Sequence, residues 1–179
     1  MKNNRIVQSA KELKNTKSLA MAAMLLAIAT VLGIFSIPVG TSIKIGLSTL
    51  AIQLTAALFG PVVSGSVGAL ADILQYLIRP TGPYFPGFTI SGAVGGIIYG
   101  LIYYKRRLTI PRIAVANLIV TVCVNILLNT FWLKVLYGKG FLALLPGRVT
   151  KNLVLLPVYV ILFYLMTRAL ERAGLRKED

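Results

Sequence analysis

The sequence predicts an all-α integral membrane protein, a bundle of six transmembrane helices with both termini on the cytoplasmic side. Three observations predict this class. Hydrophobic residues make up 56% of the 179 residues, charged residues make up 13%, and the mean hydropathy is +0.79. The apolar residues form long runs without the alternation typical of a membrane β-barrel. The basic residues are distributed unequally between the two ends of these runs.

Six apolar segments approach the roughly 20 residues that a membrane helix needs. They are Ser18–Val39, Lys44–Phe59, Pro61–Ile78, Phe88–Tyr104, Ile113–Leu136 and Val149–Leu170. The remainder is a basic N-terminal segment over residues 1–17, tight loops and a tail over residues 171–179, both expected in the cytoplasm. The chain is therefore predicted to be a single membrane domain over residues 1–179, without a soluble catalytic domain. The first segment is too long to be a removable signal peptide.

The 19 Lys and Arg residues favour this orientation. With a cytoplasmic N-terminus, thirteen lie inside, where such residues fix topology and bind anionic lipid. A nucleic-acid partner is not expected, since these clusters flank membrane segments. The remaining six lie outside and suggest an anionic ligand: Lys44, Arg79, Lys134, Lys139, Arg148 and Lys151.

Two of the segments carry small residues at four-residue spacing, which lets membrane helices approach closely. Ala23 and Ala27 in the first segment are explained either by packing inside the bundle or by docking of another membrane protein. Gly92, Gly96 and Gly100 in the fourth segment favour packing inside the bundle.

The third segment places Asp72 on a polar face together with Gln75, Tyr76 and Arg79. Asp72 is the only acid within any of the six segments, and it lies about 10 Å from the outer end at 1.5 Å per residue. A carboxylate at that depth is costly, so it is a functional candidate. The alternative is a structural pair with Arg79 or Lys44.

The fifth segment carries a polar stripe with four-residue spacing, which must face the bundle or a water-filled cavity. Its members are Asn117, Thr121, Asn125 and Asn129, followed by Trp132. Hydrogen bonds between helices explain the inner half. Asn129 and Trp132, near the outer mouth, are predicted to contact a ligand.

Two outer connections add further candidates. In the connection Leu127–Asn152, the residues Arg148, Lys151 and Asn152 share one helix face, where they either reach lipid headgroups or bind a ligand. The connection Arg79–Thr89 is rich in Pro and Gly, which indicates a rigid loop. Its Tyr84 and Phe88 form either the aromatic side of a pocket or an interfacial belt.

Catalysis is not expected. The chain has no His and a single Cys, which excludes a Ser–His pair, a His-ligated metal and an internal disulfide. It also has no phosphate-binding loop. No cofactor and no metal is predicted. Arg pairs with carboxylates and aromatic rings stack on heterocycles, so a flat, anionic, hydrogen-bonding solute is the expected ligand.

Several motifs resemble the substrate-capture (S) components of energy-coupling-factor (ECF) vitamin transporters, and within them the folate-specific branch. The similarity lies in the alanine-rich first segment and in the stretches Lys44–Leu74, Pro80–Gly92 and Asn129–Asn152. The last two stretches are similar to the folate branch in particular.

The resemblance implies high-affinity folate capture at the outer face of a bacterial plasma membrane that the chain crosses several times. It also implies a membrane coupling subunit that docks at Ala23 and Ala27, and two cytoplasmic ATPases. The ligand-binding residues it leads us to expect are Asp72, Tyr76, Tyr84, Phe88, Asn129, Trp132, Arg148, Lys151 and Asn152. An S component for riboflavin, thiamine or biotin, an ion-coupled carrier and a purely structural membrane protein are the competing hypotheses.

Overall fold

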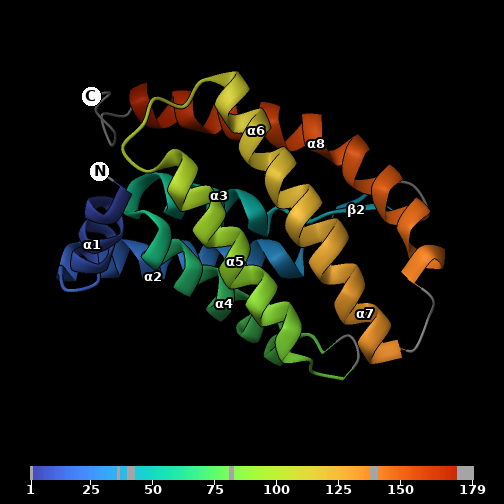
Figure 1. Ribbon diagram of the computed structural model, residues 1–179. Coiled ribbons are helices and arrows are strands. Elements are labelled where there is room, and N and C mark those ends of the chain that lie inside the picture. Colours follow the sequence, from blue (N-terminus) through green and yellow to red (C-terminus); the bar gives the residue numbers. More distant parts are fainter. Residues whose placement is uncertain (1, 36, 40–42, 81–82, 138–140, 173–179) are drawn as a thin grey trace.

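The computed structural model describes residues 2–35, 37–39, 43–80, 83–137 and 141–172. These residues form a helical bundle with one short β-hairpin (Figure 1). In chain order the elements are α1 (Lys2–Glu12), α2 (Thr16–Ile34), β1 (Ile37–Val39), β2 (Ile43–Ile45), α3 (Ser48–Phe59), α4 (Pro61–Ile78), α5 (Pro86–Tyr103), α6 (Ile110–Val120), the π-helix η1 (Thr121–Leu128), α7 (Asn129–Tyr137) and α8 (Phe141–Arg172).

Five helical stretches within the described residues are long and apolar enough to cross a membrane. They are Thr16–Ile34, Pro61–Ile78, Pro86–Tyr103, Ile110–Leu136 and Val149–Leu170. Each overlaps one of the predicted segments. The structure therefore confirms a helical fold with five candidate membrane spans, and one predicted segment differs in form.

The exception is the predicted segment Lys44–Phe59, in which the helix begins only at Ser48. A helix of 12 residues is about 18 Å long, short of the ~30 Å hydrocarbon core. The residues before it form strand β2, which pairs antiparallel with β1. The β-branched residues Ile43 and Ile45 favour that strand. The residues Ile37–Val39 form strand β1 of this hairpin. The first helix therefore ends at Ile34 and not at Val39 as predicted.

The predicted outer connection Leu127–Asn152 is also different, because most of it is helical. The helices α6, η1 and α7 follow one another without a break, and α8 begins at Phe141. Leu and Lys in these stretches are strong helix formers, which explains the longer helices.

The seam between α4 and α5 is a contact of backbone on backbone. A Cβ atom at Gly92 would collide with the backbone of Gly68, and one at Gly96 would collide with the backbone of Ser64. The Ser64 hydroxyl donates a hydrogen bond across this seam to the carbonyl of Gly96 at 2.7 Å. The predicted packing role of the glycine ridge is confirmed.

Helix α1 packs against the tight corner between α3 and α4. Gly60 forms this corner with a φ of 85°, a conformation that favours glycine. The buried Ser9 hydroxyl donates to the carbonyl of Phe59 at 2.7 Å and accepts from the N–H of Val62 at 3.0 Å. It thus satisfies two backbone groups that the corner leaves without helical partners. Helix α1 and the C-terminal end of α8 lie at the same end of the bundle (Figure 1).

Candidate functional site

A polar cavity of about 480 Å³ lies inside the bundle, with walls from α2, α3, α4, α5, α6, η1, α7 and α8. Its volume is in the usual range for small-molecule sites. The polar and charged side chains that line it are Ser48, Thr49, Asp72, Gln75, Tyr99, Asn117, Thr121, Asn125, Asn129, Lys151, Asn152 and Tyr159.

A second cavity of about 210 Å³ extends the first one toward the N-terminal part of α5. Asp72, Asn125 and Asn129 line both cavities. The extension adds the side chains of Phe88 and Ser91. An elongated ligand that occupied both cavities would therefore lie beside the carboxylate of Asp72 and the two amides where the cavities meet.

The π-helix η1 explains how one long polar stripe faces one cavity. Four-residue steps on an α-helix drift about 40° around the axis, because the repeat is 3.6 residues. A π-helix has more residues per turn, so the same step drifts in the opposite sense. The N–H of Asn129 accordingly donates to the carbonyl of Val124, five residues back. Asn117, Thr121, Asn125 and Asn129 all line the cavity as a result.

Asp72 is half-buried, and its carboxylate accepts a hydrogen bond from the Thr89 hydroxyl at 2.7 Å. Thr89 in turn lies 3.0 Å from the hydroxyl of Tyr84. Arg79, the alternative structural partner of Asp72, instead donates to the carbonyl of Ile34 at 3.3 Å. A series of hydrogen-bonded side chains, from Tyr84 through Thr89 to Asp72, therefore holds the carboxylate at the cavity wall.

The asparagines at the two ends of the stripe have different environments. The amide oxygen of Asn117 accepts from Gln53 and from the Tyr99 hydroxyl, each at 3.0 Å, which confirms the predicted hydrogen bonding between helices. Within the described residues, the buried amide oxygen of Asn129 accepts no hydrogen bond. A buried acceptor without a partner is unfavourable, so a ligand donor at Asn129 would satisfy it.

Helix α8 contributes Lys151 and Asn152 to the cavity wall, as the sequence led us to expect. Two turns further along, Tyr159 donates to the carbonyl of Gly46 at 3.1 Å and accepts from the N–H of Gly46 at 3.2 Å. These bonds fix the residue that follows the β-hairpin to α8. Arg148 belongs to the same helix, but its side chain lies outside the part that the structure describes.

The predicted aromatic residues form two groups. Tyr76 and Tyr84 contact each other, with ring centroids 5.1 Å apart. Phe85 contacts Phe88 at 6.1 Å and Trp132 at 5.6 Å, and the Trp132 indole donates to Ser91 at 3.1 Å. Of these five described rings, only Phe88 lines a cavity, the smaller one of about 210 Å³. Trp132 donates to Ser91, which lines the smaller cavity. Tyr84 of the tyrosine pair contacts Thr89, which donates to the cavity-lining Asp72.

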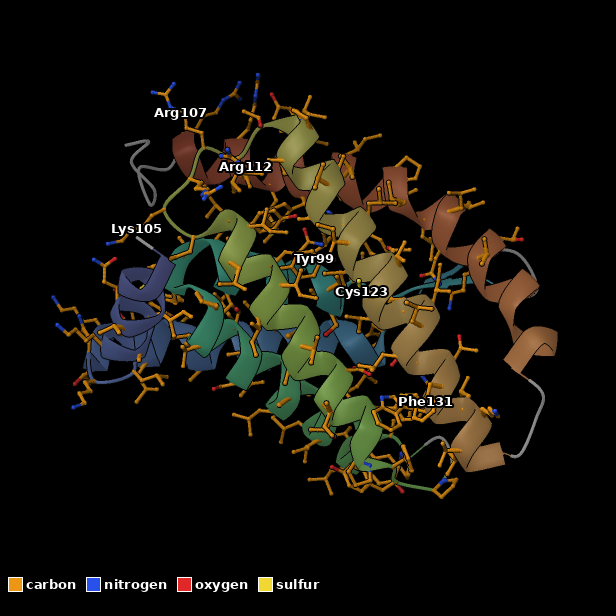
Figure 2. The ribbon with its side chains drawn as sticks, in the orientation of Figure 1. Tyr99, Lys105, Arg107, Arg112, Cys123 and Phe131 are labelled. Carbon is orange, nitrogen blue, oxygen red and sulfur yellow. The ribbon has the colours of Figure 1, made fainter. Side chains whose placement is uncertain are left out.

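Sequence reasoning missed Thr49 and Tyr99 as lining residues. Figure 2 shows Tyr99 in the middle of the bundle, away from Arg107 and Arg112, which lie near the beginning of α6. Tyr99 lies on the same helix as the glycine ridge, and no polar stripe marks that face. Asn125 belonged to a stripe that was identified, although only its outer end was assigned to a ligand.

The two predicted docking residues lie away from this site. Ala23 and Ala27 are exposed on α2, whereas Ala22 and Ala29 on the same helix are buried. The exposed alanines therefore do not pack inside the bundle.

Comparison with known proteins agrees with this architecture. The family model described as "ECF transporter, substrate-specific component" matches residues 17–167. The folate transporter FolT of Clostridium novyi (strain NT) is 39% identical over 122 residues, which cover 68% of this chain and 71% of that protein. The folate transporter FolT of Leuconostoc mesenteroides subsp. mesenteroides is 32% identical over 159 residues, 85% of each chain.

Two solved structures share the fold. A crystal structure of FolT bound with folic acid has a TM-score of 0.74 and 36% identity, and the match covers 83% of this chain and 90% of that one. The S component of a bacterial ECF transporter has a TM-score of 0.68 and 26% identity, with 98% and 100% covered. The chain therefore belongs to the substrate-specific components of ECF transporters, which are multi-pass membrane transport proteins and not enzymes.

Proposed function

We propose that this chain captures folate at the outer face of the membrane and delivers it as the S component of an ATP-driven importer. The observation that carries the proposal is the cavity in which one carboxylate, one ammonium group and a row of amides converge. Folate combines a flat ring bearing neighbouring donors and acceptors with a carboxylate tail. The similarity to two proteins named as folate transporters supports folate over other vitamins.

The charged residues suit the two ends of such a ligand. The Asp72 carboxylate accepts hydrogen bonds, so it suits the amino and ring N–H groups of the pterin, and the amide of Asn152 suits the same ring from the α8 side of the cavity. Lys151, together with Arg148 three residues earlier on α8, suits the glutamate carboxylates or the ring carbonyl. Hydrogen bonds between a charged and a neutral group contribute about 1.5–3 kcal/mol each.

The remaining predicted residues suit the flat surface and the edge of the ring. We assign Phe88, Trp132 and Tyr84 to stacking, with Tyr76 supporting Tyr84 through the ring contact described above. The unsatisfied amide oxygen of Asn129 supports a direct hydrogen bond to a ligand donor.

We further propose six membrane crossings within a single domain over residues 1–179, with residues 1–17 and 171–179 in the cytoplasm. Helix α3 is too short to cross alone, and the β-hairpin precedes it on the outer side. A hairpin satisfies its own backbone, and non-helical backbone is tolerated at membrane depth where it lines a cavity. The location of α1 and the end of α8 at one end of the bundle supports an even number of crossings.

The partners we propose are a membrane coupling subunit and two cytoplasmic ATPases, as in an ECF transporter. The exposed alanines Ala23 and Ala27 on α2 offer a smooth surface on which a helix of the coupling subunit would lie closely.

Calorimetric titration of the purified protein with folate, riboflavin, thiamine and biotin tests the proposal. We expect one-to-one binding of folate alone. Binding of another vitamin by the same cavity would contradict the folate assignment and leave the family unchanged. Uptake into vesicles that contain no ATPase subunits would instead favour an ion-coupled carrier, and a folded protein that binds none of the four would contradict ligand capture.

The partner surface has its own test. Replacing Ala23 and Ala27 by Leu should abolish co-purification with the coupling subunit while the affinity for folate stays the same. Ala169→Leu, at an exposed position on α8, is the matched control. If the double variant still co-purifies, the docking face lies elsewhere.

A further inference from the structure

A second groove of about 540 Å³ lies on the surface of the bundle and shares no lining residue with the polar cavity. It follows the seam between α4 and α5. The small residues Gly65, Ala69 and Ala93 form its floor, and Ile97 and Leu101 form one wall. The eight steps of 1.5 Å from Ala93 to Leu101 give it a length of about 12 Å along α5.

Helix α1 closes one end of this groove. Ile6 contributes to the lining there, beside the first residues of α4. The two hydrogen bonds of the buried Ser9 hold α1 in this position. The groove is therefore formed by three elements fixed relative to one another, and not by two exposed helices alone.

Basic residues gather at the same end. The Lys105 ammonium group donates to the Gln8 side chain of α1 at 3.1 Å, and Figure 2 shows Lys105 beside α1. Lys105 is exposed and has a φ of 50°, which a non-glycine residue adopts rarely. Lys11, Lys14 and Lys17 are also exposed on or just after α1. The apolar groove thus ends near Lys105, at the end of the bundle where the other basic residues of the α1 region are exposed.

This combination matches one class of ligand. The groove lies on two membrane-spanning helices, where lipid tails are as apolar as the protein, so an apolar surface alone selects no particular molecule. Positive charge at the membrane surface does select anionic lipids, because each Lys near an anionic headgroup contributes about 1 kcal/mol to binding. A molecule with an acyl chain and an anionic headgroup satisfies both parts.

We propose that the α1–α4–α5 groove binds an acidic phospholipid, with one acyl chain along α5 from Leu101 to Ala93 and the phosphate beside Lys105. The lipid belongs to the membrane leaflet at the α1 end. Its site is separate from the polar cavity, so the proposal does not depend on the identity of the transported solute.

Native mass spectrometry of the full-length protein, released from nanodiscs of equal phosphatidylglycerol and phosphatidylcholine, tests the site. We expect one retained phosphatidylglycerol molecule. Lys105→Gln should reduce its retention about fivefold, the effect of one Lys at the membrane surface. Ala93→Leu should fill the floor and abolish retention. The matched controls are Arg168→Gln and Ala169→Leu at exposed positions on α8, which should change nothing.

Four results would overturn the proposal. Equal retention of the two lipids, or an equal loss in the α8 controls, would indicate ordinary boundary lipid. Unchanged retention in both Ala93→Leu and Ser66→Leu, which lies at an exposed position of the groove, would mean that the lipid binds elsewhere. If the groove variants lost co-purification with the coupling subunit but kept the lipid, the groove would be identified as a protein interface. Thermal unfolding and folate titration of each variant separate these results from misfolding and from failure of the folate assignment.

Discussion

The two sides of the polar cavity are built differently. On one side α4 and α5 lie backbone against backbone along the glycine ridge, and the Ser64 hydroxyl bonds across the seam. On the other side the described parts of α7 and α8 make little contact with each other, and the chain that leads into α7 is a π-helix. The closely packed side carries Asp72, and the loosely packed side carries Asn129, Lys151 and Asn152.

This difference indicates a division of roles within the site. A carboxylate buried in a membrane must be held in a polar environment, and the close α4–α5 seam places Thr89 where it can donate to Asp72. The amides of Asn129 and Asn152 on the other side require less support than Asp72, because a neutral group costs less to bury than a charge, and Lys151 is the one charged residue among the described lining residues there. The loosely packed side is therefore the one able to adjust to a ligand.

The largest effect should come from breaking the closely packed side. Gly96→Leu places a side chain where the backbone of Ser64 and Gly65 already lies, and overpacking of this kind costs at least about 1–3 kcal/mol. We expect loss of folded protein, measured by thermal unfolding in detergent. Gly46→Ala is the control, since a Cβ atom there meets nothing within 4 Å. A stable Gly96→Leu variant would show that the seam is not close-packed.

The next largest effect concerns the charge on that side. Asp72→Asn keeps the shape of the side chain and removes the charge, so folate affinity should fall about 10- to 100-fold, the equivalent of one charged hydrogen bond. Calorimetric titration measures this loss. Ser66→Ala on the same helix, whose hydroxyl bonds to the carbonyl of Val62, should leave the affinity unchanged. An unaltered Kd for Asp72→Asn would remove this residue from the site.

A pair of variants on the polar stripe should have opposite effects. Asn129→Leu removes a buried acceptor without a partner, so stability should stay the same or rise while folate affinity falls up to about tenfold. Asn117→Leu leaves Gln53 and Tyr99 without their acceptor, so stability should fall by about 1–3 kcal/mol. Unfolding and titration on both variants separate the two roles. Equal destabilisation by both would contradict the distinction.

The smallest effect should come from Tyr84→Phe. This change removes the contact with the Thr89 hydroxyl at an exposed position and leaves the ring beside Tyr76. A neutral hydrogen bond contributes about 0.5–1.5 kcal/mol, and exposure reduces it, so we expect a loss of affinity of about threefold or less. Tyr84→Ala, which also removes the ring, should lose more. If Phe and Ala are equivalent at this position, the ring does not contact the ligand.

Much of this structure was predictable from the sequence, because membrane helices are determined by the length and polarity of each segment. The sequence does not reveal where such a segment changes from helix to strand. Ile37–Val39 and Ile43–Ile45 are as apolar as the helices beside them, and their pairing depends on contacts distant in the chain. The π-helix is likewise invisible, because it changes hydrogen-bond partners without a change in composition.

The site was predictable where its residues are polar and regularly spaced. Asp72 and Asn129 were predicted because polar groups inside a membrane need partners, and Lys151 and Asn152 because they share one helix face in the basic outer connection. Tyr99 was not identified, since an aromatic residue beside a glycine ridge is typical of ordinary packing. Trp132 was identified by type, but whether it lines the cavity or supports Ser91 depends on the rotation of α7, which the sequence does not specify.

The π-helix also affects how this cavity can acquire a different ligand over evolutionary time. A hydrogen bond to the fifth preceding residue accommodates extra chain within an otherwise continuous helix, so a single-residue insertion or deletion at η1 changes the local pitch. Such an event would rotate Asn129 and its neighbours past the cavity by a fraction of a turn, while the Asp72 side keeps its position. Families that share this scaffold thus have a route to new ligands through changes of chain length as well as of side chains.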